Sequence, residues 1–227
     1  MDDIFLRTFG IDKGLVFLTG AGGKTSLIKR MALDAKAQGK SVLVTASTKM
    51  YLPDYCDHTD LSGGCFADSE ITGGIYVVSE GLDHNKITIS DEKVFCELKE
   101  RFDLVLAEAD GSKKKPLKGW AHYEPVVYDC GDHTIGVVNF SVVGRRVNES
   151  LVHRFELFTR ITGLKEGDIV TKEHLYRLIS DENGLFKASC GEKMVYFSHC
   201  TDKTAVDRQD MRTFCGDVFS GYIAEIM

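Results

Sequence analysis

The chain has few prolines, no long apolar run and no surplus of positive charge. Its three prolines, Pro53, Pro116 and Pro125, are scattered, and neither a Pro-rich linker nor an internal repeat is found. No apolar run approaches the roughly 20 residues that a membrane-spanning helix needs. The formal net charge of −6 disfavours nucleic acid or an anionic membrane as a partner, because both would repel an acidic surface.

The N-terminal sequence MDDIFLRTFG opens with acidic residues and lacks the basic-then-apolar pattern of a secretion signal. We therefore expect a cytoplasmic protein. The seven cysteines form no C-x-x-C pair, and in a reducing compartment we expect most of them to be buried small apolar residues. Cys56, His58 and Cys65 lie near one another, but no fourth ligand follows at a spacing typical of zinc sites, so we expect no zinc there. We assign no catalytic cysteine.

Apolar runs and helically spaced segments alternate along the chain. Residues 15–19 form a continuously apolar run, 26–38 has apolar residues at helical spacing, and 41–46 is predicted as the next strand, which together predict a right-handed βαβ unit. Further strands are predicted at 74–79, 86–90, 103–110, 134–140 and 193–198, and further helices at 91–102, 149–162, 171–180 and 203–226. The pattern is typical of an α/β fold with a mostly parallel sheet flanked by helices. We expect one domain, 1–227, in which 150–190 is a candidate small helical appendage.

A glycine-rich turn joins the first strand to the first helix of this unit. A P-loop reads G-x-x-x-x-G-K-[ST], which would require glycine where this chain has Leu18. The chain instead has the shorter G-x-x-G-K-T, which is similar to the loop of Mur-type ligases. Converging backbone N–H groups and the start of a helix can still hold phosphate, and the lysine can reach the β and γ oxygens. The predicted nucleotide-binding residues are Gly20, Ala21, Gly22, Gly23, Lys24, Thr25 and Ser26. The alternative is a plain glycine turn with a solvated lysine.

Two carboxylates follow the predicted strand 103–110. Glu108 and Asp110 are two residues apart, so in extended chain they point to the same side. We predict that Thr25 and Glu108 bind Mg²⁺. We predict Asp110 and Lys24 as catalytic residues, Asp110 orienting water or an acceptor and Lys24 screening phosphate charge. There are two alternatives. Glu108 and Asp110 form an acidic turn without function, or their two roles are exchanged.

Other polar segments leave two interpretations open. Lys113, Lys114 and Lys115 form either a solvated loop or a site that recruits an anionic second ligand. The hydroxyls of Thr45, Ser47 and Thr48, with Lys49, belong either to a polar loop or to the phosphate site. For each of these two segments, both interpretations stay open.

Several segments together resemble the YqeC family, whose members are described as accessory proteins of selenium-dependent molybdenum hydroxylases. The segments, spread over residues 15 to 190, are FLTGAGGKTSL, VTASTKM, EADGSKKKPLKGWAHYEPVV, TIGVVNF, VHRFELFTRITGL and GLFKAS. The resemblance implies a P-loop NTPase-like, three-layer protein that binds Mg²⁺ and a nucleoside triphosphate, ATP or GTP. It implies a molybdenum hydroxylase or a cofactor-biosynthesis protein as partner, with no nucleic acid and no membrane. Monomer and homodimer are both consistent with it.

The chain departs from the family pattern at two places. Members tend to have T-T-T-T-K-M where this chain has TASTKM, and an N-K-x-D-like segment where it has HCTD, so that only Asp202 remains of a guanine-reading sequence and the base stays open. His153, Arg154 and Glu156 fall in the matching H-R-x-E, either as a phosphate or proton-transfer group or as a charge network at a helix start. The resemblance favours an NTP-hydrolysing maturation factor. The alternatives are an NTP-dependent small-molecule kinase or ligase and a non-catalytic binding module.

Overall fold

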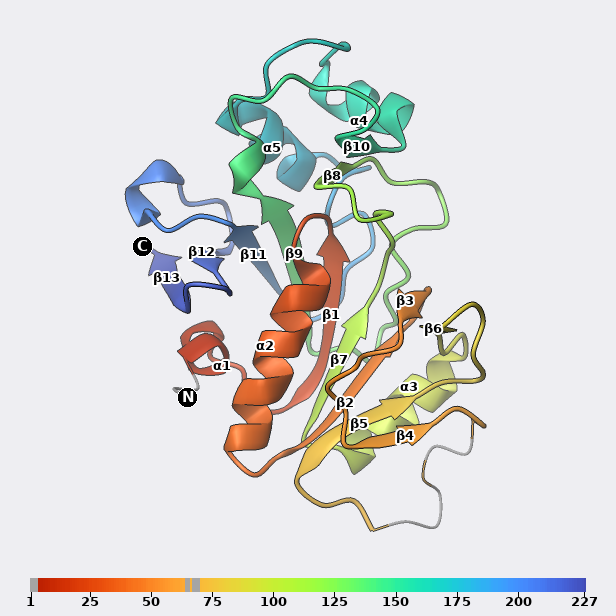
Figure 1. The fold of residues 1–227 in the computed structure, drawn as a ribbon. Coiled ribbons are helices and arrows are strands. Elements are labelled where there is room, and N and C mark those ends of the chain that lie inside the picture. Colours follow the sequence, from red (N-terminus) through yellow and green to blue (C-terminus); the bar gives the residue numbers. More distant parts are fainter. Residues whose placement is uncertain (1–3, 64–65, 67–69) are drawn as a thin grey trace.

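A mostly parallel sheet runs through the centre of the structure (Figure 1). The computed structural model describes residues 4–63, 66 and 70–227. Within these residues, nine strands form one sheet in the order β13-β12-β11-β9-β1-β7-β2-β5-β4. Neighbouring strands are parallel, except that β12 and β13 are antiparallel. The predicted α/β fold with a mostly parallel sheet is confirmed.

The strands and helices have the following bounds. The strands of the main sheet are β1 Gly14–Gly20, β2 Ser41–Ala46, β4 His58–Asp60, β5 Gly74–Val78, β7 Leu104–Glu108, β9 His133–Asn139, β11 Glu192–Ser198, β12 Arg212–Asp217 and β13 Tyr222–Ile226. Two short ladders pair β3 Met50–Tyr51 with β6 Lys86–Ile87 and β8 Leu117–Lys118 with β10 Val152–His153. The α-helices are α1 Ile4–Phe9, α2 Lys24–Ala37, α3 Glu92–Arg101, α4 Phe155–Thr162 and α5 Lys172–Ser180, and short 3-10 helices occupy Phe140–Val142 and Lys203–Ala205.

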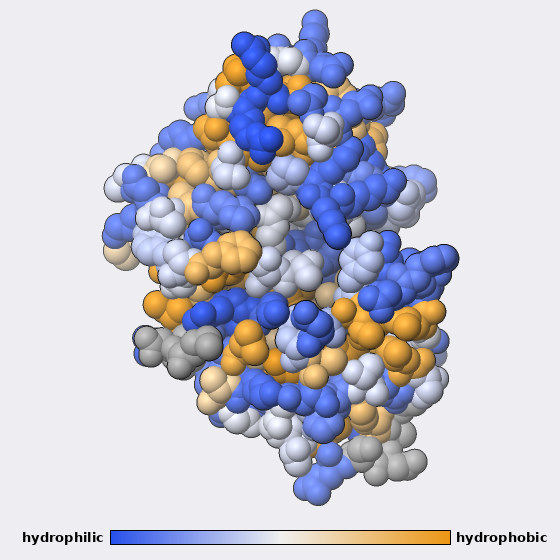
Figure 2. Space-filling view, viewed as in Figure 1, coloured by the Kyte–Doolittle hydropathy of each residue, from blue (hydrophilic) through white to orange (hydrophobic). Residues whose placement is uncertain are grey.

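Helices cover both faces of the sheet. Successive side chains of a strand point to opposite faces, so Val16 and Leu18 of β1 pack in one cluster with α1 and α2, whereas Leu15 and Phe17 pack with α3. Figure 1 shows α2 in front of the sheet and α3 behind it. Hydrophilic and hydrophobic side chains are interspersed over the face that carries α2 (Figure 2). Because both faces are covered, the central strands are continuously buried, which is why they appear in the sequence as unbroken apolar runs.

The predicted helix over 203–226 is wrong. This segment contains a short 3-10 helix and then the antiparallel pair β12 and β13 at the edge of the sheet. Gly216 is required there, because a Cβ at this position would lie 2.6 Å from the carbonyl oxygen of Tyr222 on the partner strand. Gly221 has a φ of 74° in the turn between the strands, a conformation that interrupts a helix. These two glycines outweigh the helical spacing of the apolar residues.

Two other predicted elements differ from the structure, and one helix was missed. The helix predicted over 149–162 begins only at Phe155, because Val152–His153 forms β10 and Arg154 has a left-handed φ of 55°. The strand predicted over 86–90 is limited to β6, which pairs with β3 outside the main sheet. Helix α1 was not predicted. Its Phe5, Leu6 and Phe9 are buried against the sheet, although six residues are too few to show a periodic pattern.

Residues 150–190, the candidate appendage, pack directly against the sheet. Phe158 of α4 and Leu178 of α5 share one apolar cluster with Val195 and Phe197 of β11. These strand residues alternate with Met194 and Tyr196, which face α1 and α2 in the first cluster. Helices α4 and α5 therefore cover the same face of the sheet as α3, over the strands β9, β11 and β12.

Among the described residues, no helix combines the length and the apolar character that crossing a membrane requires.

The substitution Phe158→Ala tests whether α4 unfolds together with the sheet. Phe158 is fully buried, so the cavity left by its ring should lower the free energy of unfolding by about 3–5 kcal/mol. Urea unfolding followed by tryptophan fluorescence and by far-UV circular dichroism should show one shared transition at a lower midpoint. The exposed Phe219→Ala is the matched control and should leave the midpoint near that of the wild type. Two separated transitions would indicate that 150–190 is an independent unit.

Candidate functional site

The glycine turn lies at the carboxyl end of β1, in the middle of the sheet. Gly20, Gly22 and Gly23 all have positive φ, at 98°, 76° and 146°. A Cβ at Gly20 would lie 2.2 Å from the carbonyl oxygen of Val137, and one at Gly22 would lie 2.5 Å from the Cβ of Asn139. Both conformation and space therefore require glycine, and the turn packs closely against β9.

Helix α2 begins directly after this turn. Gly23, the N-cap residue immediately before the helix, has no side chain to cap it. The first N–H groups of this 14-residue helix therefore lack a side-chain partner. These groups and the positive end of the helix dipole favour an anion. Gly22, Gly23, Lys24, Thr25 and Ser26 line an adjoining cavity of about 650 Å³.

The other two predicted nucleotide-binding residues do not line this cavity. The N–H of Gly20 donates to both carboxylate oxygens of Asp110, and the N–H of Ala21 donates to the carbonyl oxygen of Val137. Their backbone N–H groups hold the turn in place. The residues of the turn that line the cavity are those from Gly22 onward.

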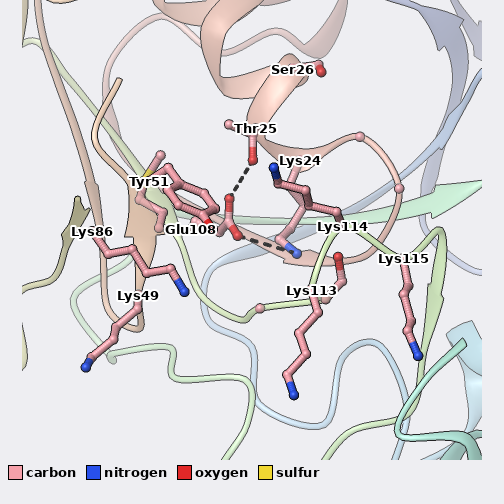
Figure 3. A pocket seen from close by; sticks show the side chains of 15 residues that line it. Lys24, Thr25, Ser26, Lys49, Tyr51, Lys86, Glu108, Lys113, Lys114 and Lys115 are labelled. Carbon is pink, nitrogen blue, oxygen red and sulfur yellow. Dashed lines mark hydrogen bonds and ion pairs between the residues drawn. The ribbon is translucent and has the colours of Figure 1, made fainter. Parts of the chain in front are cut away.

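Thr25 and Glu108 meet across two neighbouring elements of the fold. The Thr25 hydroxyl donates to Oε2 of Glu108 at 3.0 Å, as shown in Figure 3. Glu108 is the last residue of β7, and Leu18 and Ala46 flank it in register on β1 and β2. A hydroxyl beside a carboxylate is an oxygen pair of the kind that binds Mg²⁺, which usually takes one or two protein ligands and completes its shell with water and phosphate. Burial raises the pKa of the Glu108 carboxyl.

Lys24 lies between the turn and the two carboxylates. Its Nζ donates to the carbonyl oxygen of Gly20 at 2.5 Å and lies 3.0 Å from Asp110 and 3.9 Å from Glu108. Burial lowers the pKa of this ammonium, but the two carboxylates outweigh burial and hold the pKa above its usual value. Lys24 therefore carries a positive charge at the edge of the cavity.

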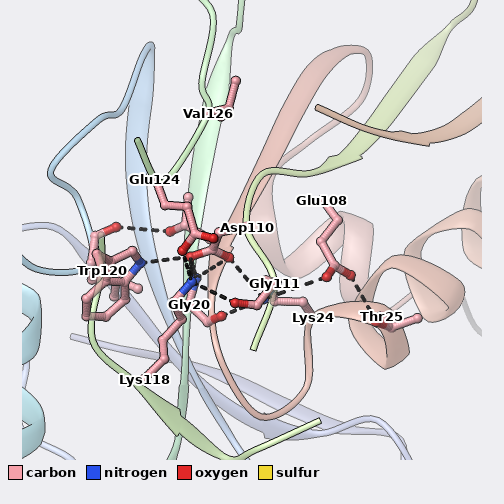
Figure 4. Close-up of polar contacts among 12 residues, drawn as sticks. Gly20, Lys24, Thr25, Glu108, Asp110, Gly111, Lys118, Trp120, Glu124 and Val126 are labelled. Carbon is pink, nitrogen blue, oxygen red and sulfur yellow. Dashed lines mark hydrogen bonds and ion pairs between the residues drawn. The ribbon is translucent and has the colours of Figure 1, made fainter. Parts of the chain in front are cut away.

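Asp110 is fully buried beneath the turn (Figure 4). Besides the N–H of Gly20, it accepts hydrogen bonds from Lys118 Nζ at 2.9 Å and from Trp120 Nε1 at 2.8 Å. Burial raises the pKa of this carboxyl, but the ammonium groups of Lys24 and Lys118 outweigh burial and lower it. Asp110 is therefore an ionised anchor for the turn, and its carboxylate does not line the cavity.

The buried network continues from Asp110 towards α4. Lys118 also donates to Oε2 of Glu124 at 2.8 Å, and Arg154 donates to Oε1 of Glu124 at 2.9 Å. Arg154 thus belongs to a charge network before α4. Burial and the neighbouring Arg154 lower the pKa of His153 to about 4, so this imidazole is neutral at pH 7. Sequence reasoning missed the role of Lys118 altogether.

Six lysines line the cavity, and they come from separate segments of the chain (Figure 3). They are Lys24, Lys49, Lys86, Lys113, Lys114 and Lys115. Glu108 is the one carboxylate in the described lining. The cavity is thus strongly cationic, in a chain whose net charge is −6. This contrast indicates a site for anionic small molecules.

The predicted hydroxyl loop contributes less to the cavity than expected. Thr45 donates to the carbonyl oxygen of Val78, and Ser47 donates to that of Val126. The Thr48 hydroxyl is buried and has no hydrogen-bond partner in the described part of the chain. Lys49 lines the cavity and forms an ion pair with Asp83 at 2.5 Å.

Asp202 is the residue that remains of the guanine-reading sequence. The Asp202 carboxylate accepts hydrogen bonds from Thr204 and lies at the start of a 3-10 helix. His199 and Asp217 instead line a small hollow beside Ser26 of α2. The His199 ring stacks on Phe219, with ring centroids 6.1 Å apart.

Two expectations concern metals and cysteines. Cys65, one member of the cluster with Cys56 and His58, lies outside the described residues. Across residues 4–63, 66 and 70–227, no group of three or more His, Cys, Asp or Glu side chains is placed to hold a metal ion. Of the six described cysteines, Cys200 and Cys215 are buried and the others are partly exposed, so burial is less complete than expected.

These features define a mostly parallel α/β protein with a glycine turn and a lysine-lined cavity at the carboxyl edge of its sheet. The chain belongs to the YqeC family, because the model of that family, described as "YqeC protein", matches residues 16–156. It is 29% identical over 188 residues to "Uncharacterized protein YqeC" of Escherichia coli strain K12, covering 76% of this chain and 70% of that protein. No solved structure matches the chain.

Replacing Asp110 by asparagine tests its role as a buried anchor. Asp110→Asn leaves Lys24 and Lys118 without their shared buried counter-charge, which should lower the free energy of unfolding by about 3–5 kcal/mol. Glu108→Gln should cost only about 1 kcal/mol, since it weakens one hydrogen bond to Thr25 and a long ion pair of 3.9 Å with Lys24, which keeps Asp110 as its closer partner. Urea unfolding at pH 7 measures both. Equal losses in the two variants would contradict the anchor.

The stabilising effect of Asp110 should also depend on pH. Its pKa is lowered in the folded protein, so its contribution is fully present above the unfolded value of about 3.9 and is lost as the pH falls through the folded value. The difference in unfolding free energy between wild type and Asp110→Asn should therefore be constant from pH 7 to pH 5 and decrease below about pH 4. A difference that stays constant down to pH 2 would be the opposite result.

Proposed function

We propose that the chain binds a magnesium–nucleoside triphosphate at the glycine turn and that it has a P-loop NTPase-like fold. The N–H groups from Gly22 onward and the start of α2 would receive the phosphates, and Lys24 would turn from the Gly20 carbonyl oxygen to the β and γ oxygens. Thr25 and Glu108 would hold the magnesium ion. When bound there, magnesium would supply positive charge beside the phosphates.

The observation that carries this proposal is the contact between Thr25 and Glu108. The two oxygens are 3.0 Å apart although 83 residues separate them in sequence, and they lie at the mouth of the lysine-lined cavity. A plain glycine turn with a solvated lysine requires neither this carboxylate nor the burial of Lys24, whose relative exposure is 4%. The short G-x-x-G-K-T turn is therefore compatible with phosphate binding.

Asp110 has a supporting part in this proposal. Its two oxygens are engaged by Gly20, Lys118, Trp120 and Lys24, so we assign it to the positioning of the turn and of Lys24. The expectation that it orients water or an acceptor stays a prediction.

The biological role we propose is that of a cytoplasmic, NTP-hydrolysing accessory protein in the maturation of a selenium-dependent molybdenum hydroxylase or its cofactor. This role is what the resemblance to the YqeC family implies. An NTP-dependent small-molecule kinase or ligase is the second candidate, because the cavity beside the turn is much larger than the phosphate site alone. If no nucleotide binds, the remaining candidate is a non-catalytic binding module.

Thermal shift with four proteins tests the nucleotide site. The wild type, Lys24→Ala, Thr25→Val and Thr25→Ser are each titrated with ATP and GTP, with and without Mg²⁺. A ligand at about 100-fold excess over its Kd stabilises the folded state by about 2.7 kcal/mol, so binding to the wild type should raise the Tm visibly. Lys24→Ala should lose most of this shift. Thr25→Val should lose the magnesium-dependent part, and Thr25→Ser, which keeps the hydroxyl, should retain it.

Thr25 is exposed, so in the absence of ligand neither Thr25→Val nor Thr25→Ser should change the free energy of unfolding by more than about 1 kcal/mol. A magnesium-dependent shift that persists unchanged in Thr25→Val would overturn the metal site. An unchanged shift in Lys24→Ala would overturn the phosphate site.

A further inference from the structure

The wall of the cavity opposite the glycine turn carries more positive charge than one nucleotide requires. Tyr51 of β3 and Lys86 of β6 are paired in the β3–β6 ladder, and Lys113 and Lys114 reach the cavity from the loop that follows Asp110. We call Tyr51, Lys86, Lys113 and Lys114 the lysine wall. Figure 3 shows Tyr51 and Lys86 at one side of the cavity, Lys114 reaching from its loop towards the start of α2, and Lys113 pointing away from the other three.

The charges of the lysine wall are not balanced within the protein. Lys49 pairs with Asp83, and Lys115 donates to the carbonyl oxygens of Glu149 and Val152. Over the described part of the chain, by contrast, none of the three wall lysines has an ion pair with a carboxylate. Magnesium cancels much of the charge of a triphosphate, and Lys24 and α2 face the remainder. The wall would therefore stay cationic with a nucleotide bound.

Two lysines of the wall lie against the same aromatic ring. Lys86 Nζ lies 5.1 Å and Lys114 Nζ 5.2 Å from the centre of the Tyr51 ring, so two ammonium groups share one aromatic side chain. Contacts of a cation with an aromatic ring offset only part of their repulsion. Lys113 and Lys114 have left-handed φ values of 52° and 61°, which lysine rarely adopts and which often accompany a binding site. An anion bound beside Tyr51 would be attracted by both ammonium groups.

The composition of the cavity favours phosphate as that anion. Its described lining contains six lysines and no arginine. Lysine binds phosphate oxygens as a point charge, and a cluster of ammonium groups matches the charge of a phosphate better than that of a single carboxylate. The described lining also contains no histidine, and its one carboxylate bonds to Thr25. A neutral hydroxyl acceptor would need a base, whereas an ionised phosphate oxygen does not.

We propose that the lysine wall binds a second ligand, a phosphate-bearing small molecule, in the same cavity as the nucleotide. The cavity volume of about 650 Å³ lies in the range of small-molecule sites. Tyr51, with 51% of its surface exposed, offers an apolar contact to the organic part of such a ligand. Binding of this ligand to the lysine wall does not depend on the proposed nucleotide site. Its role as the acceptor of a reaction does rest on that proposed site.

Binding of inorganic pyrophosphate to the nucleotide-loaded protein tests the wall. The full chain is saturated with a non-hydrolysable ATP or GTP analogue in excess Mg²⁺, and pyrophosphate is titrated by calorimetry. The double variant Lys86→Gln/Lys114→Gln should raise the Kd for pyrophosphate by about tenfold or more. Its Kd for the nucleotide analogue should rise by clearly less than its Kd for pyrophosphate, since within the described residues no hydrogen bond or ion pair joins Lys86 or Lys114 to the glycine turn. Lys193→Gln, an exposed lysine at the opposite edge of the sheet, is the matched control and should change neither value.

Three results would separate the wall from the nucleotide site. Pyrophosphate affinity that is unchanged in the double variant overturns the wall. Pyrophosphate that only displaces the nucleotide, with no second binding event, overturns it as well. If no nucleotide binds to the wild type, the titration is made on nucleotide-free Lys24→Ala. Binding that persists there and is lost on adding Lys86→Gln/Lys114→Gln supports the wall while the proposed function fails.

Discussion

The ionised carboxylate of Asp110, buried beneath the glycine turn, is the interaction on which the site depends. It accepts the N–H of Gly20 and lies between the ammonium groups of Lys24 and Lys118. A buried charge persists only when it is paired and hydrogen-bonded, so each of these groups fixes the others in place. The turn is therefore held from below by the protein itself, and its open side is left for a ligand.

The same network connects the turn with the far side of the molecule. Lys118 joins Asp110 to Glu124, and Glu124 in turn binds Arg154 immediately before α4. The elements from the glycine turn to α4 thus share one set of buried charges, while α4 and α5 pack on the same sheet through apolar contacts. Above this network the cavity has the opposite character, because its lining is rich in lysine and contains Glu108 as its carboxylate.

The strand–turn–helix unit could be predicted because it follows local rules, and Thr25 and Glu108 could be assigned to one site because each lies at or just after the end of a predicted strand of one parallel sheet. A continuously apolar run indicates a buried parallel strand, and the carboxyl ends of neighbouring parallel strands meet at one edge. The C-terminal hairpin could not be predicted in this way. Its apolar residues are compatible with a helix, and the decision for strands comes from the close approach of Gly216 to Tyr222 across the pair.

The sequence by itself determined the fold class, the glycine turn and the residue types that can hold phosphate and magnesium, because these depend on neighbouring residues. Tertiary structure decided which of them face the cavity. It turned the N–H groups of Gly20 and Ala21 towards Asp110 and Val137, and it buried Asp110 against Lys118 and Trp120. It also brought Lys86 to Lys114 around Tyr51. Such contacts join segments distant in sequence, and only the packing of the whole sheet fixes their geometry.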